Sequence, residues 1–210
     1  MSVALHPRVL ELIASKICHD MVSPVGAISN GVELMEELGE SAEALSLISS
    51  SAEQASIRLK CFRLAYGGAG TDKNIGFKEI IDAFTDWIKA GNVNVKFDDD
   101  LSLKFSMPPK GFLKVLLNLL MLVTECSKGE GEIHVSALEG NKGVKILTTG
   151  SNIGFREGVE EALVGESNPE ELDARSVHSY LAGQFAKHFD LKIEHNLSEG
   201  SDALEVSLSF

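Results

Sequence analysis

The chain has 210 residues, enough for one large domain or two small ones, and 44 % of them are hydrophobic. Its formal net charge of −12 makes nucleic acid and anionic membranes poor partners, so we expect neither. The three cysteines lie too far apart for a disulfide framework, which favours a reducing compartment. With no signal-peptide pattern and no apolar run of about 20 residues, we expect a cytoplasmic protein.

The first part of the chain predicts a helical hairpin. From His6 to Leu38, apolar residues recur every three or four positions and form one helical stripe. Its members are Leu10, Ile13, Ile17, Met21, Val25, Ile28, Val32 and Met35. Gly39–Glu43 reads as a turn in which Ser41 caps a second helix, and this helix ends at Tyr66–Gly70.

The second helix carries a coiled-coil type of spacing. Apolar side chains alternate at steps of three and four, at Leu45, Ile48, Ala52, Ala55, Leu59 and Phe62. Two antiparallel helices cannot bury two such stripes between themselves, so we expect a homodimer that forms a four-helix bundle. The alternative is that the hairpin packs against the rest of its own chain.

After residue 70 the pattern predicts a second domain in which helices and strands mix. We expect helices at Phe77–Lys89, from Pro108 through Val123, at Phe155–Val164, and at Ala174–Phe189 with Asp173 as cap. Strands are expected at Val93–Phe97, Leu101–Phe105, Glu132–Leu138, Gly143–Thr148, Leu191–His195 and Ala203–Phe210. The prediction is an α+β chain, with a hairpin domain at 1–70 and an α/β sandwich at 71–210 whose mixed sheet is covered on one face.

One histidine of the first helix stands apart from the apolar stripe. His19 lies about half a turn from the centre of the stripe, and its outward neighbours are small: Ser15, Ser23, Gly26 and Asn30. Asp20 can accept a hydrogen bond from one ring nitrogen and leave the other free as a nucleophile. The alternative is an ordinary surface histidine. No histidine pair has metal-ligand spacing beside a carboxylate, so we expect no metal site.

The segment around His19 resembles the phospho-acceptor box of bacterial histidine kinases. The shared pattern is His19-Asp20 followed by Pro24 and, further on, Asn30, placed on the first helix of a hairpin. The element order of the second domain is similar to that of the kinases' ATP-binding domain, so the resemblance covers nearly the whole chain.

The second domain departs from the kinase pattern wherever a kinase binds nucleotide. Asn118 is kept, but Leu122 occupies the position of the kinases' magnesium-binding asparagine. The adenine-reading aspartate is missing from Thr148–Gly154, and the phosphate-loop glycines are missing from Val177–Tyr180. The segment between Gly154 and Ala174 is acidic, which would repel a nucleotide. We therefore expect no ATP binding and no cofactor.

A kinase-like hairpin without a nucleotide site is similar to the ChpT-type histidine phosphotransferases of two-component phosphorelays. The resemblance implies that His19, oriented by Asp20, takes a phosphoryl group from the receiver domain of a hybrid kinase and passes it to a response regulator. The receiver domain would supply the magnesium ion. The expected receiver-docking surface consists of Ser15, Lys16, Ser23, Gly26 and Asn30.

Two other functions remain open from the sequence. A sensor histidine kinase with weak ATP-dependent autophosphorylation would keep His19 as its own substrate. A non-catalytic dimeric signalling scaffold would not need His19 at all.

Overall fold

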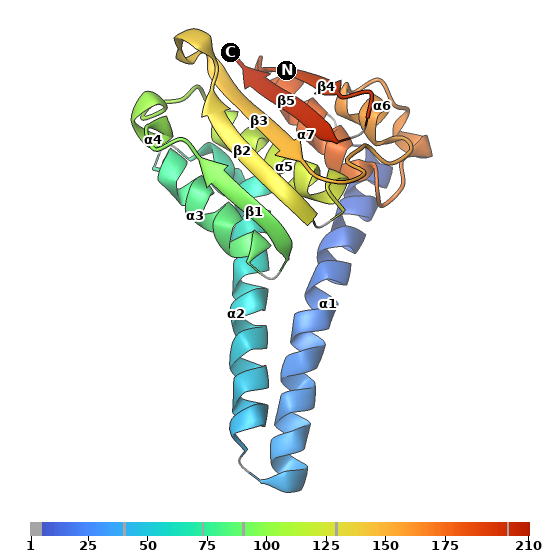
Figure 1. The fold of residues 1–210 in the computed structure, drawn as a ribbon. Helices are drawn as coiled ribbons and strands as arrows, with labels where there is room; N and C mark the ends of the chain where they lie inside the picture. Colours follow the sequence, from blue (N-terminus) through green and yellow to red (C-terminus); the bar gives the residue numbers. More distant parts are fainter. Residues whose placement is uncertain (1–5, 40, 73, 90, 129, 201) are drawn as a thin grey trace.

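A long helical hairpin projects from a mixed body in this computed structural model, which describes residues 6–39, 41–72, 74–89, 91–128, 130–200 and 202–210 (Figure 1). The hairpin consists of α1 (Pro7–Leu38) and α2 (Ala42–Ala65). In the body, a five-stranded sheet carries α3, α5 and α7 on one face. The α+β class with an N-terminal helical hairpin is therefore confirmed. None of the described helices is both long and apolar enough to cross a bilayer.

Local chemistry explains where the hairpin helices begin and end. The side chain of His6 caps α1 by accepting from the backbone N–H of Arg8, with Pro7 in the first turn. The hydroxyl of Ser41 accepts from the N–H of Ala44 at 3.0 Å and caps α2 as expected. Helix α1 ends at Gly39, whose φ of +80° lies in the left-handed region.

The body follows the hairpin through a short 3₁₀ turn, η1 (Gly68–Thr71). Its helices are α3 (Phe77–Ile88), α4 (Leu101–Lys104), α5 (Phe112–Cys126), α6 (Val159–Leu163) and α7 (Val177–His188). Two further 3₁₀ turns are η2 (Glu139–Asn141) and η3 (Pro169–Glu171). Its strands are β1 (Asn92–Phe97), β2 (Glu130–Ala137), β3 (Gly143–Thr149), β4 (Lys192–Leu197) and β5 (Ala203–Ser209). The sheet order is β1-β2-β3-β5-β4, with β1 and β2 parallel and the other pairs antiparallel.

The strand expected at Leu101–Phe105 is wrong, because this segment forms the helical turn α4. Leu101 and Phe105 are both buried, whereas Leu103 between them is 80 % exposed. Residues four apart share one face of a helix, while a strand would place all three on one face. The apolar residues fit both patterns in sequence, and the exposure of Leu103 distinguishes them.

Three helices are shorter at their starts than expected. Helix α5 begins at Phe112, not at Pro108, because Gly111 precedes it in the left-handed region with φ +82°. The helix expected to begin at Phe155 likewise begins only at Val159, as α6, because Gly158 precedes it with φ +76°. Helix α7 begins at Val177 and not at Ala174. Asp173 caps the turn before it, because its carboxylate accepts from the N–H groups of Arg175 and Ser176, each at 2.8 Å.

The root of the hairpin is part of the core of the body. Helix α5 is buried along nearly its whole length, and the end of α2 joins the same apolar cluster through Phe62 and Leu64. The start of α1 joins a second cluster, in which Val9 and Leu12 meet side chains next to and within α7. The rest of the hairpin extends away from the body, so only its root packs against its own chain.

The apolar stripe expected along α1 is divided in the structure. Ile13 is buried, and Ile17, Met21, Ile28 and Met35 are half-buried. Leu10, Val25 and Val32 are exposed, by 56 %, 50 % and 43 % respectively.

Gly31 marks the close approach of α1 and α2, and Gly31→Ala tests it. An added Cβ would lie 2.6 Å from Cγ1 of Ile48 and 3.3 Å from the carbonyl oxygen of Ala44. Gly26→Ala is the matched control in the same helix, because nothing lies within 4 Å of its added Cβ. We expect Gly26→Ala to raise the free energy of unfolding by up to about 1 kcal/mol through helix propensity. The free energy of unfolding of Gly31→Ala should be lower than that of Gly26→Ala by about 1–3 kcal/mol, because the added methyl group overpacks the contact. Urea denaturation measures both, and equal effects would contradict the close approach.

Candidate functional site

His19 is displayed on the projecting part of α1. Its side chain is 88 % exposed, and its Nδ1 lies 3.3 Å from Oδ1 of Asp20. Among the described residues, nothing hydrogen-bonds to the other ring nitrogen, Nε2. When Nδ1 carries the proton and donates a hydrogen bond to Asp20, Nε2 keeps a free lone pair that faces solvent. The Asp20 side chain is only 20 % exposed, so it is much more enclosed than the histidine that it contacts.

The small residues expected around His19 do form an open strip. Ser15, Ser23, Gly26 and Asn30 are all exposed on α1. Because these four side chains are short, they leave the imidazole accessible to a partner along the strip.

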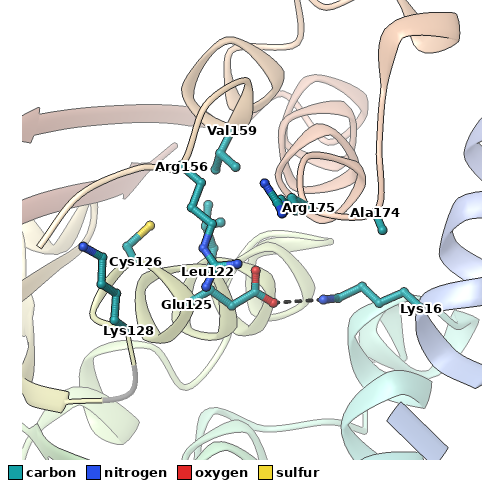
Figure 2. Close-up of a pocket in the computed structure, with 9 residues that line it drawn as sticks. All are labelled: Lys16, Leu122, Glu125, Cys126, Lys128, Arg156, Val159, Ala174 and Arg175. Atoms are coloured by element: carbon teal, nitrogen blue, oxygen red, sulfur yellow. Dashed lines mark hydrogen bonds and ion pairs between the residues drawn. The ribbon is translucent and has the colours of Figure 1, made fainter. Parts of the chain in front are cut away.

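Lys16, which the sequence placed on the expected receiver-docking surface, is paired with a residue of the body instead. Its side chain is 18 % exposed, and its ammonium lies 3.1 Å from Oε1 of Glu125 at the end of α5. Lys16 therefore faces the body and joins α1 to it, one turn before His19 in the helix. Figure 2 shows this ion pair spanning the gap between the two helices.

Glu125 is the centre of a charge cluster that sequence reasoning missed. Besides Lys16, its Oε1 lies 3.6 Å from Nδ1 of the fully buried His178 on α7, which is an ion-pair distance rather than a hydrogen bond. Burial alone would raise the pKa of Glu125, but His178 and Lys16 outweigh it and hold that pKa at about 2. Glu125 thus stays ionised and ties α1, α5 and α7 together. The only sequence signal was a carboxylate near the end of a strongly apolar helix.

Two polar residues of α5 hold the end of α2. The Lys114 ammonium donates to the carbonyls of Tyr66 at 3.0 Å and Gly67 at 2.7 Å. The Asn118 amide donates to the carbonyl of Ala65 at 2.9 Å. Carbonyls at a helix end lack intrahelical donors, so these contacts satisfy groups that burial would otherwise leave unpaired. Asn118, the asparagine that resembles a kinase residue, therefore has a structural partner here. Burial lowers the pKa of Lys114 to about 8.

The region that resembles a nucleotide site is lined differently from that of a kinase. Leu122 is 1 % exposed and directs an apolar side chain into the core. Val177, His178 and Ser179 are buried at the start of α7. A pocket of about 300 Å³ remains between α1, α5, α6 and the start of α7 (Figure 2). Within the described residues, no group of three histidine, cysteine or acidic side chains is arranged to hold a metal ion.

Glu125→Gln tests whether the charge cluster stabilises the fold. A carboxylate with a lowered folded pKa contributes stability above its unfolded pKa and loses it as pH falls toward the folded value. The window here lies between the ordinary value of 4.5 and about 2. Because the side chain is 40 % exposed, solvent screening reduces the effect. Between pH 5 and pH 3, we expect the free energy of unfolding of the wild type to fall by about 1 kcal/mol more than that of Glu125→Gln, measured by urea denaturation.

Glu139→Gln is the control, because Glu139 is an exposed carboxylate in η2. Its free energy of unfolding should fall by as much as that of the wild type. Equal losses in the wild type and Glu125→Gln would refute the stabilising role.

Comparison with known proteins identifies the family. A family model described as the histidine phosphotransferase C-terminal domain matches residues 77–201. The protein phosphotransferase ChpT of Brucella abortus (strain 2308) is 33 % identical over 186 residues, which cover 87 % of each chain. A solved structure of a bacterial phosphotransferase superposes with a TM-score of 0.78 at 28 % identity, covering 99 % of this chain and 98 % of that one. The chain belongs to the ChpT-type family of phosphorelay histidine phosphotransferases.

Proposed function

We propose that His19 is the phosphoryl carrier of this phosphotransferase. The observation that supports this most directly is the exposed imidazole, held at Nδ1 by Asp20 and surrounded by small side chains on a projecting helix. Receiver domains of a hybrid histidine kinase and of a response regulator are the proposed donor and acceptor. The cytoplasmic location expected from the sequence stays a prediction.

The chemistry follows from the two nitrogens of His19. Nε2 attacks the phosphorus of an aspartyl phosphate on the receiver, a nitrogen–phosphorus bond forms, and the phosphorus–oxygen bond to the aspartate breaks. The proton stays on Nδ1, so the ring gains positive charge, which the Asp20 carboxylate stabilises from 3.3 Å. Transfer to the next receiver is the reverse of these steps. We expect the magnesium ion for this transfer to be held by the receiver domain, not by this chain.

His19→Ala should abolish phosphoryl acceptance. Mixed with a receiver domain phosphorylated on aspartate, the wild type should gain phosphate that is acid-labile and base-stable, and the variant should gain none. Asp20→Asn keeps a hydrogen-bond acceptor but removes the charge, so we expect labelling that is slowed by roughly 10- to 100-fold. The measurement is transfer of radiolabelled phosphate, followed by gel electrophoresis.

The same assay separates the alternatives. Labelling of His19→Ala at the wild-type rate would show that His19 is not the acceptor. Labelling of the wild type by magnesium–ATP without a receiver would favour a weak histidine kinase, which we do not expect. Absence of labelling under every condition would favour the scaffold.

We further propose that the protein acts as a homodimer through the outer face of the hairpin. Leu45, Ala52 and Leu59 lie seven residues apart on α2 and are all exposed. Val25 and Val32 form a similar exposed pair on α1. Apolar residues that repeat every seven positions pack well against a second helical pair, as in a four-helix bundle.

Leu45→Lys with Leu59→Lys should convert the dimer into a monomer. These side chains are 51 % and 53 % exposed in one protomer, so the lysines should leave the folded monomer intact. In a dimer interface the same charges would be buried without a partner, which would destabilise the dimer. Multi-angle light scattering after gel filtration measures the mass. Leu103→Lys is the control, because Leu103 is 80 % exposed on α4 of the body and should leave the dimer intact. An unchanged mass of the double variant, or a monomeric wild type, would refute this interface.

A further inference from the structure

A pocket of about 300 Å³ at the junction of α1, α5, α6 and α7 is lined mainly by positive side chains, although the chain as a whole is acidic (Figure 2). Four cationic side chains line it, Lys16, Lys128, Arg156 and Arg175, against one carboxylate, Glu125. The whole chain carries 19 basic and 31 acidic residues, so this concentration of positive charge runs against the overall balance.

Three of these cations have no carboxylate partner in the part of the chain that the structure describes. Lys16 is paired with Glu125, which accounts for the carboxylate in the pocket. Within the described residues, no carboxylate lies within ion-pair distance of Lys128, Arg156 or Arg175. Asp173 is close enough to influence Arg175 electrostatically, but its Oδ1 accepts from the N–H groups of residues 175 and 176, and neither of its oxygens forms an ion pair with the Arg175 guanidinium among the described residues. All three residues are exposed, so water screens part of their mutual repulsion, and an anion bound between them would relieve the rest.

The three cations also line a second, more open hollow of about 620 Å³ beside the first. Its single carboxylate is Glu157. In Figure 2, Arg156 and Arg175 come from different segments of the chain, before α6 and before α7, and both reach the same pocket. An anion placed there would therefore contact cations from both segments.

The inner wall of the pocket is apolar. Leu122, Cys126 and Val159 are all at least 95 % buried and line its interior. Burial raises the pKa of the Cys126 thiol to about 12, so this side chain is neutral and behaves as an apolar one. The pocket thus combines a small apolar wall with a cationic rim, a pairing that suits a ligand with an apolar part and an anionic group.

We propose that this pocket binds a small phosphate-bearing ligand without a metal ion, with Arg156, Arg175 and Lys128 as the phosphate-binding side chains. Guanidinium groups hold phosphate oxygens by paired N–H donors, and a lysine ammonium adds a point charge. The one carboxylate that lines the pocket, Glu125, is paired with Lys16, and the wall formed by Leu122, Cys126 and Val159 offers no oxygen ligand for magnesium. The protein's cations therefore neutralise the phosphate directly. This binding site is separate from the phosphoryl carrier proposed above, because His19 does not line the pocket.

The test is titration of the full chain with inorganic phosphate, pyrophosphate and phenyl phosphate in EDTA at fixed ionic strength. Binding is followed by isothermal calorimetry and by amide shifts in NMR spectra. We expect saturable one-to-one binding, with shifts at residues 156, 159 and 175. Phenyl phosphate should bind more tightly than phosphate if the ester's apolar part uses the wall, whereas equal affinities would assign the site to inorganic phosphate. Both results support a phosphate site and distinguish its ligand.

The variant Arg156→Gln with Arg175→Gln should weaken binding at least about tenfold, which corresponds to about 1.4 kcal/mol. Lys110→Gln removes the same kind of charge from an exposed position outside the pocket and should bind within about twofold of the wild type. His19→Ala should also bind normally, so failure of the phosphoryl-carrier proposal would leave this result unchanged. Circular dichroism checks that the variants fold.

Two outcomes would overturn the proposal. One is the absence of saturable binding of all three anions up to 10 mM. The other is equal weakening by Lys110→Gln, which would show only general attraction between anions and surface charge. Loss of receiver binding in the double variant, with no binding of small anions to the wild type, would instead assign these cations to protein docking.

Discussion

The position of the hairpin depends on how α5 holds the end of α2. Lys114 and Asn118 donate to three consecutive carbonyls, those of Ala65, Tyr66 and Gly67, where α2 would otherwise end unsatisfied inside the protein. Each buried carbonyl left without a donor would cost about 1–3 kcal/mol. These bonds, together with the shared apolar core, fix the direction in which the hairpin leaves the body. On the other helix, the Lys16–Glu125 ion pair adds a contact just before His19.

This attachment separates the buried root of the hairpin from the exposed surface that carries His19. Val9, Leu12 and Ile13 are buried against the body, while His19 and its small neighbours lie beyond that contact on the same continuous helix. The helix runs through Pro24, although proline removes one helical hydrogen bond. A buried nucleophile would have to be uncovered before reacting, whereas the proposed nucleophile, His19, is already exposed.

Sequence periodicity predicted the hairpin, the Ser41 cap of its second helix and the order of most elements, because these depend on local spacing and on residue types. The His6 cap of α1 was not predicted. It placed His19 and Asp20 together because neighbours in a helix stay together. The strand expected at Leu101–Phe105 failed because two buried residues four apart fit a helical turn equally well. The helix starts near Phe112 and Val159 were missed because Gly111 and Gly158 adopt positive φ, which sequence spacing does not reveal.

The polar contacts at the junction lay beyond sequence reasoning for a different reason. Lys16, Glu125 and His178 are separated by more than 50 residues from one another, and only the fold brings them together. Arg156 and Arg175 are closer in sequence, but they also share a pocket only because two loops converge beside α5. Such constellations depend on tertiary packing and leave no periodic pattern in the chain.

The exposed imidazole of His19 would have a kinetic consequence for a carrier. With its one free ring nitrogen on one strip of α1, a protomer would engage only one receiver domain at a time. If His19 is the carrier, donor and acceptor must alternate, which is a ping-pong scheme in which the first partner leaves before the second binds. Each receiver domain then competitively inhibits the other half-reaction. The relative abundance of the two partners, and not a conformational change in the helix, would set the direction of phosphate flow.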